Sequence, residues 1–383
     1  MKALFCHDGP ISCDSKSRYY SIGFNDRLLS RYEKIFGNIS FITRVERKEN
    51  YSEMEKISTD RFKIIEYPDY LNFKGIFRNK TKSDNILKKE ILKNDLLIIR
   101  LPSFLGSKCI KIAKEYNKPY LIELVGCPWD SLRNHGITGK ILAPYMYLLT
   151  KYQVKTATDV LYVTDKFLQK RYPTKGNEIG CSDVELQSIT SFFRKSEDKN
   201  IKNKNIVIGT IGKIDLIYKG QETVIKAMKI LMEEGYDIQY QIVGPGNKNY
   251  LKNIAKELKI LDKVCFIGVL SHEQIFDWLD KIDLYIQPSL TEGMPRSLIE
   301  AMSRGCPCIA SNAGGMPELL EEKFIFKKGN EKQLAQIILE SKQNQLFNQS
   351  KRNTEFVKKF LAKEINEKRK KFYEEFRNRL RSK

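Results

Sequence analysis

Long apolar stretches are absent from this chain of 383 residues. A helix that crosses a bilayer needs about 20 predominantly apolar residues, and no run approaches that length. The apolar start at Met1 to Cys6 is too short to be the core of a secretory signal peptide. We therefore expect a cytoplasmic protein without a membrane-spanning segment.

Patterns that hold metal ions are also missing. The eight cysteines stand at irregular positions, and the Cys306-x-Cys308 pair has no second pair of ligands to complete a zinc site. The chain contains no Asp-x-Asp motif either. We interpret the cysteines as reduced, mostly buried thiols, and we expect no metal and no cofactor.

Acidic residues are few relative to basic ones. Lysine and arginine number 67 against 47 aspartates and glutamates, which gives a formal net charge of +20. Such an excess calls for an acidic partner or for tolerance of self-repulsion. Nucleic acid is not indicated, because zinc knuckles, aromatic RNA-binding motifs and basic repeats are all missing. An anionic membrane surface and a solvated, lysine-rich surface remain as alternatives.

The length and the periodicity predict two α/β domains. A chain this long exceeds an ordinary single domain, and 41% apolar with 30% charged residues is typical of a globular protein. Strands alternate with helices, which predicts a doubly wound parallel sheet. In the first part we expect strands at 2–6, 38–43, 62–67, 95–101, 119–125 and 159–164, with helices that include 20–36, 107–116 and 143–157.

A second series of strands and helices begins after a polar, charge-dense run at 194–205, which we interpret as the linker. We expect a first domain over 1–193, a second over 205–354 and a C-terminal helix over 355–383 that packs on the first domain. The expected helix at 143–157 is apolar around much of its circumference. Packing in a core is the simpler reading, and contact with a membrane interface stays open.

The most specific pattern lies between Asp283 and Glu318. A buried strand at 283–287 leads through a glycine turn to Pro295, a favourable first helical residue. Met294 before it offers no side-chain oxygen to cap the helix. The amides around Arg296 and Ser297 are therefore free to bind a phosphate.

Two carboxylates accompany this helix start. Glu292 precedes it directly after the strand and is followed by Gly293, and Glu300 comes about a turn and a half into the helix. A polyol held near the phosphate could donate hydrogen bonds to both. For Glu300 alone, a solvated or lysine-paired helix residue is the alternative.

Basic residues follow the first strand of the second domain. Gly212-Lys213 and Lys219-Gly220 flank one strand-to-helix connection, so both ammonium groups can converge on one diphosphate. Each lysine alone could equally be a solvated surface residue. His272, at another helix start, is expected to be a surface residue.

Taken together, Glu292-Gly-Met-Pro295, Glu300 and Gly314-Gly-x-Pro-Glu318 resemble the E-x7-E signature of retaining glycosyltransferase family 4. The resemblance implies the GT-B fold, in which two Rossmann-like domains face a cleft and a C-terminal helix crosses back to the first domain.

The resemblance also implies roles for the residues of the second domain. Glu300 would bind the ribose hydroxyls of a nucleotide, and Glu292 the transferred sugar. Lys213 stands where the family commonly has arginine, and with Lys219 it would stabilise the leaving diphosphate. The remaining expected substrate-binding residues are Gly9, Gly212, Gly268, Gly293, Met294, Pro295, Arg296 and Ser297.

In the first domain the resemblance is weaker. Family members often carry a histidine after the strand expected at 119–125, whereas this chain has Gly126-Cys127 there. Either His135 takes that place from the following loop, or the contact is missing. We expect the acceptor to bind near Gly9, Asp130 and His135.

The expected function is retaining transfer of a sugar from a UDP- or GDP-sugar to a glycan or lipid-linked acceptor, in bacterial cell-surface polysaccharide synthesis. The reaction would take place in the cytoplasm, at the inner face of the plasma membrane if the basic surface binds it. The alternatives are a GT-B sugar-nucleotide epimerase, a non-catalytic nucleotide-sugar-binding subunit and, on charge alone, a nucleic-acid-binding protein.

Overall fold

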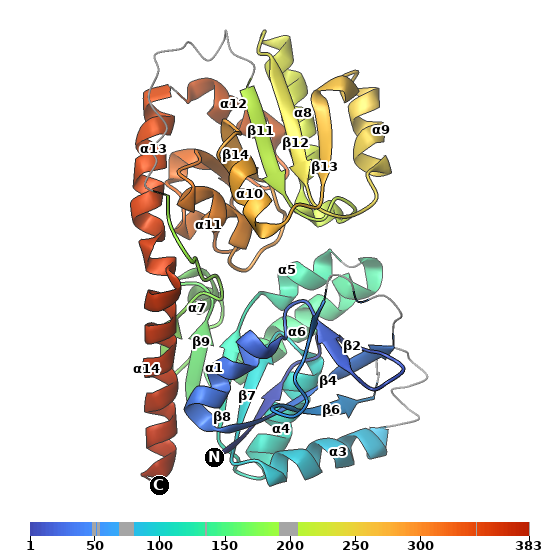
Figure 1. Ribbon diagram of the computed structural model, residues 1–383, viewed down its shortest axis with the longest axis vertical. Helices are drawn as coiled ribbons and strands as arrows, with labels where there is room; N and C mark the ends of the chain where they lie inside the picture. Colours follow the sequence, from blue (N-terminus) through green and yellow to red (C-terminus); the bar gives the residue numbers. More distant parts are fainter. Residues whose placement is uncertain are drawn as a thin grey trace. The chain divides into compact units, whose positions relative to one another are not determined.

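The computed structural model describes residues 1–47, 51, 54–68, 80–134, 136–190, 206–341 and 343–382. These residues form two compact units, labelled by their elements in Figure 1. The first unit comprises Met1–Val163, Leu168–Cys181 and Glu367–Lys383, and the second comprises Thr164–Phe167 and Ser182–Asn366. The chain thus passes between the units at 181–182, before the segment expected to be the linker, which lies outside the described residues.

The first unit is built on a ten-stranded sheet. Its strands β6, β4, β1, β7, β8, β9 and β10 run parallel in that order, and the order turns back between β1 and β7. This is the doubly wound arrangement expected from the sequence. The strands are β1 Lys2–Cys6, β2 Ile11–Cys13, β3 Tyr19–Ser21, β4 Asn38–Arg47, β5 Glu55–Lys56, β6 Lys63–Tyr67, β7 Leu96–Leu101, β8 Tyr120–Leu124, β9 Asp159–Tyr162 and β10 Asn177–Gly180.

The first helix begins later than expected. Asn25 caps it by accepting a hydrogen bond from the Leu28 amide at 3.2 Å, so the helix starts at Asp26, and 19–21 form a strand instead. The apolar residues before Asn25 continue the helical spacing in the sequence, and they led to a predicted start that is too early. The helices of this part are α1 Asp26–Phe36, α3 Lys80–Lys93, α4 Phe104–Glu115, α5 Pro128–Arg133, α6 Gly136–Lys155 and α7 Phe167–Arg171.

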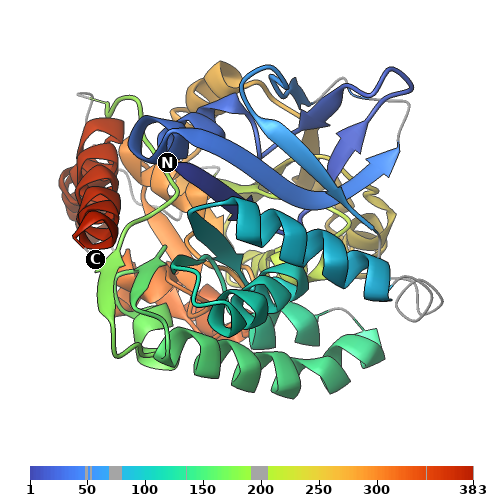
Figure 2. The same cartoon turned by 90° about the horizontal axis from the view of Figure 1, so that it is seen from below.

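Helix α6 is longer than the 143–157 helix expected. It begins at Gly136, so Pro144 lies inside the helix and not in its first turn. A proline there removes one backbone hydrogen bond, which a helix of 20 residues tolerates. Figure 2 shows α6 in green along the margin of the first unit, beside α4 in teal.

The C-terminal segment is two helices with a break, not the single helix expected over 355–383. Helix α13 (Gln343–Phe356) ends before a short 3-10 turn, η6 (Val357–Phe360), and α14 (Ala362–Arg381) follows. From residue 367 on, α14 belongs to the first unit. There the Tyr373 ring packs against Phe36 of α1, and its hydroxyl donates to the buried Glu123 of β8.

The second unit has a six-stranded parallel sheet, in the order β13-β12-β11-β14-β15-β16. Helix α8 packs against α9 and α12 on one face, and α11 packs against α10 and α13 on the other (Figure 1). The strands are β11 Ile206–Ile211, β12 Ile238–Val243, β13 Val264–Gly268, β14 Leu284–Gln287, β15 Cys308–Ser311 and β16 Ile325–Phe326. The helices are α8 Gln221–Glu233, α9 Asn249–Glu257, α10 His272–Leu279, α11 Arg296–Ser303 and α12 Glu331–Glu340, with 3-10 turns that include η2 Ile217–Lys219 and η4 Met316–Glu318.

Two further expectations concern thiols and membranes. Seven of the eight cysteines are buried, as expected for mostly buried thiols, and their reduced state stays a prediction. Over the described part of the chain, none of the helices is both long enough and apolar enough to cross a bilayer.

Candidate active site

The site lies where the strand order of the second unit turns back. Strands β11 and β14 are neighbours, and the chain leaves them toward opposite faces of the sheet. In doubly wound sheets, ligands bind outside the carboxyl ends of the strands at this switch point. Lys213 and Lys219 follow β11, and Glu292 follows β14. Topology alone therefore brings these two loops to one edge.

Gly220 allows the loop after β11 to come close to the end of β14. Its φ is +74°, and a Cβ on it would lie 2.1 Å from the carbonyl oxygen of Pro288, just after β14. No side chain fits at that distance, so glycine is required here for both the backbone conformation and the close approach. The preceding Lys219 is thereby held beside the end of β14.

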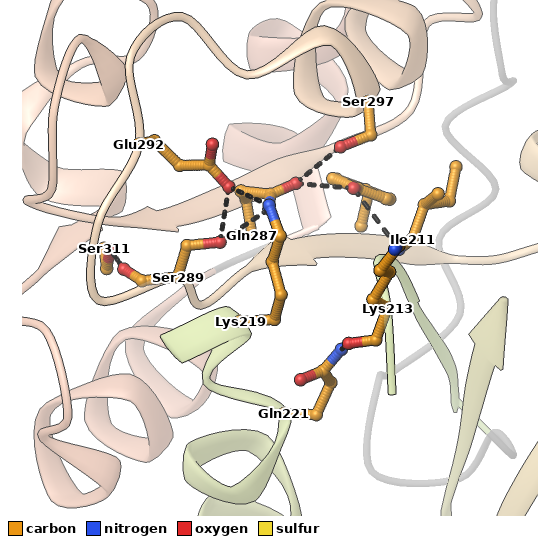
Figure 3. Close-up of polar contacts among 10 residues, drawn as sticks. Ile211, Lys213, Lys219, Gln221, Gln287, Ser289, Glu292, Ser297 and Ser311 are labelled. Carbon is orange, nitrogen blue, oxygen red and sulfur yellow. Dashed lines mark hydrogen bonds and ion pairs between the residues drawn. The ribbon is translucent and has the colours of Figure 1, made fainter. Parts of the chain in front are cut away.

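Lys219 and Glu292 form an ion pair in this position (Figure 3). The Lys219 Nζ donates to Glu292 Oε1 at 2.7 Å, and the two side chains are 23% and 15% exposed. Ser289 Oγ donates to the same carboxylate oxygen at 2.8 Å. Glu292 Oε1 thus accepts hydrogen bonds from an ammonium group and from a hydroxyl group, at a sheet edge that solvent still reaches.

Buried polar side chains from β14 support Glu292 from below. Gln287 Nε2 donates to Ser289 Oγ at 3.0 Å, and Gln287 Oε1 accepts from Tyr285 OH at 2.7 Å and from Ser297 Oγ at 2.8 Å (Figure 3). The network fixes the rotamer of Ser289 and therefore the position of the Glu292 oxygen. It also ties Ser297, in the first turn of α11, to the end of β14.

The start of α11 differs by one residue from the expectation. Pro295 is the cap residue and Arg296 the first helical one, and no side chain caps the helix. Proline, like methionine, has no side-chain oxygen that could accept a hydrogen bond from the first amides. The first amides of the helix therefore have no capping side chain whether the cap residue is Met294 or Pro295. The positive end of the helix macrodipole faces the same region as Lys219 and Glu292.

Glu300 is buried within α11. It is 6% exposed, and His272 Nε2 lies 3.7 Å from Glu300 Oε1. Burial raises the pKa of the Glu300 carboxyl, and the charge of Arg296 opposes that rise. The simple alternative of a solvated glutamate is excluded by this burial. His272 has a 58% exposed side chain, as expected for a surface residue, but its contact with Glu300 was not foreseen.

The second half of the motif buttresses the turn that carries Glu292. Gly314 has φ +59°, and a Cβ there would lie 2.2 Å from the carbonyl oxygen of Glu292. The amide of Gly315 donates to the carbonyl of Gly293 at 2.8 Å, and Met294 reaches to within 3.1 Å of the place a Gly315 Cβ would take. Two glycines are thus needed for this close packing. Glu318 has a different role: it accepts from the amides of Asp165 and Phe167.

Three further predicted site residues lie at the carboxyl edge of the sheet through their backbone contacts. The Lys213 side chain is exposed, and its carbonyl accepts from Gln221 Nε2 at 3.2 Å. The amide of Gly212 donates to Val243 at 2.9 Å, and Gly268, with φ +88°, accepts from Gly244 at 2.8 Å, so both lie at the carboxyl edge of the sheet.

The predicted residues of the first unit are not brought together by any described contact. Gly9 follows β1 at that unit's own switch point, and its carbonyl accepts from Thr43 Oγ1 at 2.8 Å. Asp130 pairs with Arg171 at 2.7 Å. His135 lies outside the described residues, so its expected place in the site stays a prediction.

Metal ligands do not cluster anywhere in the ranges that the structure covers: there is no group of three or more His, Cys, Asp and Glu that could hold an ion. Independence from metals stays a prediction, which rests on the cations and amides around Glu292.

Sequence reasoning missed the polar support of the site, namely Tyr285, Gln287, Ser289, Ser311 and Gln221. Ser311 Oγ donates to the Ser289 carbonyl and joins β15 to the network (Figure 3). A glutamine at the end of an otherwise apolar strand was a usable signal, because a buried amide requires partners.

Comparisons with known proteins agree with this geometry. The model of the family described as "Glycosyl transferases group 1" matches residues 191–374. The chain is 37% identical over 341 residues to Protein CapJ of Staphylococcus aureus, covering 88% of this chain and 85% of that protein. It is also 34% identical over 137 residues to the amylovoran biosynthesis glycosyltransferase AmsK of Erwinia amylovora, covering 33% of this chain and 34% of that one.

Solved structures resemble the fold. Sucrose-phosphate synthase from Thermosynechococcus elongatus superposes with a TM-score of 0.69 at 15% identity, covering 99% of this chain and 100% of that one. WaaG, a glycosyltransferase involved in lipopolysaccharide biosynthesis, gives 0.65 at 14% identity, with 97% and 99% covered. The fold is therefore that of the GT-B glycosyltransferases, which confirms the expected class. Within that class, the chain belongs to the group 1 glycosyl transferases.

Proposed function

We propose that this protein transfers a sugar, with retention of its anomeric configuration, from a nucleotide-diphosphate sugar to a glycan or lipid-linked acceptor. The observation that carries the donor half is the pairing of Lys219 with Glu292 beside the uncapped start of α11. Cations and free amides gathered at one sheet edge suit a diphosphate. An adjacent carboxylate suits sugar hydroxyls.

In the proposed reaction, the bond between the anomeric carbon and the diphosphate oxygen breaks, and negative charge grows on the leaving diphosphate. Lys219, Lys213 and the amides of Arg296 and Ser297 would stabilise that charge without a metal ion. The acceptor hydroxyl would bond to the anomeric carbon on the face that the diphosphate leaves, and its proton would pass to an oxygen of the departing diphosphate. We assign Glu292 to the transferred sugar as a hydrogen-bond acceptor, not as a covalent nucleophile.

Glu300 would hold the ribose of the nucleotide in this proposal. Its carboxylate is buried and has no lysine or arginine ion partner within the described part of the chain. A buried acceptor of this kind is satisfied by ligand hydroxyls, because they replace the hydrogen bonds that water would have made.

The proposal for the acceptor is based on the names of similar proteins. Proteins similar to parts of this chain act, by their names, in the biosynthesis of amylovoran, colanic acid and O-antigen. We therefore propose a role in bacterial surface polysaccharide synthesis, in the cytoplasm at the inner face of the plasma membrane.

The donor assignment is tested by thermal shift with a panel of UDP-sugars, GDP-sugars and other nucleotide-sugars. Binding to the folded state raises the melting temperature by mass action, so one nucleotide class should raise it in a concentration-dependent way. Inorganic pyrophosphate and inorganic phosphate serve as controls for non-specific anion binding. Equal shifts with every anion, or none with any nucleotide-sugar, would refute the assignment.

The identified donor then allows the reaction to be tested. Turnover that requires an acceptor, with the anomeric configuration of the product read by NMR, separates a retaining transferase from an inverting one. Conversion of the nucleotide-sugar without any acceptor would identify an epimerase instead.

A further inference from the structure

Helix α6 of the first unit carries apolar residues on its exposed side as well as on its buried side. Its buried side carries the apolar residues Ala143, Met146 and Val154 together with two polar ones, of which Thr150 is 0% and Gln153 4% exposed. Gln153 Oε1 accepts from Ser107 Oγ of α4 at 3.1 Å, and Gln153 Nε2 donates to the Ser107 carbonyl at 3.3 Å. Globular surface helices bury their apolar stripe and expose the polar one. In α6 the buried side combines apolar packing with the hydrogen bonds of Gln153, and a second set of apolar residues lies on the outside.

The outward side of α6 is a continuous apolar stripe, which we call the α6 stripe. Its members are spaced by 4, 4, 3 and 4 residues, which keeps them on one side of the helix. Each is more than half exposed. They are Ile137 at 77%, Ile141 at 71%, Tyr145 at 60%, Leu148 at 64% and Tyr152 at 61%. The stripe runs over about four turns of one helix, so it forms a continuous patch, unlike apolar residues scattered singly over a surface.

The charged residues of α6 itself all have one sign. The sequence of α6 contains no aspartate or glutamate, and its lysines Lys140, Lys151 and Lys155 are exposed. Lys114 of α4 lies 4.8 Å from the ring centre of Tyr152 and adds a further cation beside the stripe. The net charge of +20 has the same sign as this face.

We propose that α6 lies in the plane of an anionic membrane surface, with the α6 stripe inserted among the lipid headgroups and acyl ends. The isoleucines and the leucine supply apolar area, and the tyrosines are amphipathic rings suited to the interface. The lysine stems extend along the apolar surface and place their ammonium groups at the phosphates. The helix is about 30 Å long at 1.5 Å per residue, so the whole stripe fits one flat surface.

A lipid surface fits this face better than a second copy of the chain does. Two copies meeting through α6 would bring lysines from both against a common apolar strip, and no acidic residue of α6 could pair with them. An anionic bilayer supplies both the apolar interior and the negative charge.

This inference extends the proposed function, because a lipid-linked acceptor would lie at the surface that α6 binds. It is measured without donor or acceptor, so it can fail while the transferase assignment stands, and the reverse. The assay is co-sedimentation of the full chain with vesicles of phosphatidylcholine alone or with phosphatidylglycerol added. We expect binding to the phosphatidylglycerol vesicles, reduced by raising the salt concentration.

The decisive variant is Ile141→Ser combined with Leu148→Ser. Both side chains are exposed, so the fold should be kept, and the apparent binding constant for phosphatidylglycerol vesicles should fall at least tenfold. Ile22→Ser is the matched control, because Ile22 is 67% exposed in the same unit but is not part of α6. It should bind vesicles as the unchanged protein does.

The charges are tested separately by Lys140→Gln combined with Lys151→Gln, which should reduce binding on the order of tenfold at low salt and little at high salt. Undiminished vesicle binding by the serine variant would overturn the proposal. So would a concentration-dependent dimer, or a complex with an acidic protein, that the serine variant abolishes while vesicle binding is absent.

Discussion

The unusual residue of the site is Glu300, a carboxylate whose burial raises its pKa. A carboxyl group with a raised pKa in the folded state favours its neutral form there. Between its ordinary value of 4.5 and the raised value, the folded state holds a proton that the unfolded state has lost. The contribution of Glu300 to the free energy of unfolding is therefore largest below its ordinary pKa. It is lost as the pH rises through the raised pKa of the folded state.

Glu300→Gln should accordingly stabilise the unliganded protein at pH 7.5, because the neutral amide has no charge to desolvate. At pH 4 the difference should vanish, since both side chains are then neutral. Thermal melts at the two pH values measure it, and Glu257→Gln, at an exposed position of α9, should show no such change.

The same Glu300→Gln variant should bind the nucleotide-sugar more weakly by calorimetry, because a carboxylate accepts hydrogen bonds from hydroxyls more strongly than an amide does. A variant that is more stable and yet binds less well is the expected signature of a functional residue. Unchanged donor affinity would remove Glu300 from the ribose site.

Lys219→Ala tests the leaving-group role. Removing a cation aimed at the developing charge should lower the turnover on the order of 10²-fold to 10³-fold. The stability loss should be small, about 1 kcal/mol or less, because the ion pair with Glu292 is partly exposed. Lys226→Ala is the control, since Lys226 is also paired, with Glu222 on α8, but away from the site. Wild-type turnover of the Lys219 variant would refute its assignment.

At the scale of elements, the turn before α11 depends on its contact with the Gly314–Gly315 pair. Gly314→Ala should cost the strain of a positive φ, about 1–2 kcal/mol. The added methyl would also collide with the Glu292 carbonyl, so the turn must move and donor affinity must fall. Gly235→Ala separates the two effects: its φ is +88°, but nothing lies within 4 Å of the added methyl. Equal losses of stability in denaturant and equal donor affinity in both variants would contradict this account.

At the scale of the whole molecule, the last helix is part of the first unit. Glu123 is buried on β8 at 2% exposure and accepts hydrogen bonds from Tyr32 of α1 and Tyr373 of α14. Arg100 of β7 lies 3.8 Å away. One carboxylate thus joins four elements of the unit.

Tyr373→Phe should therefore destabilise the protein by about 1.5–3 kcal/mol, the cost of removing a hydrogen bond to a buried charged group. Tyr250→Phe removes an exposed tyrosine–glutamate hydrogen bond, to Glu222, and should cost about 0.5 kcal/mol or less. Urea denaturation compares the two, and similar losses would show that Glu123 does not anchor the helix.

The sequence predicted the strands around the site well, since a strand and a glycine turn are local patterns. It placed the start of α1 wrongly, because apolar residues before Asn25 imitated a helical period that the cap ends. It also could not pair Lys219 with Glu292, 73 residues apart, or find Gln287 beneath them. Those contacts depend on which strands become neighbours.

By itself, the sequence determined the class of this protein. The features that define the class are local sequence patterns: alternating strands and helices, an uncapped helix start, two spaced carboxylates and a glycine pair. The tertiary structure decided which charges meet, which carboxylates are buried and which face of α6 points outward. Strand order decides which charges meet, and close packing decides which carboxylates are buried. The packing of α6, which includes the bond of Gln153 to Ser107, decides which face of the helix points outward. Each of these depends on residues that are far apart in the sequence.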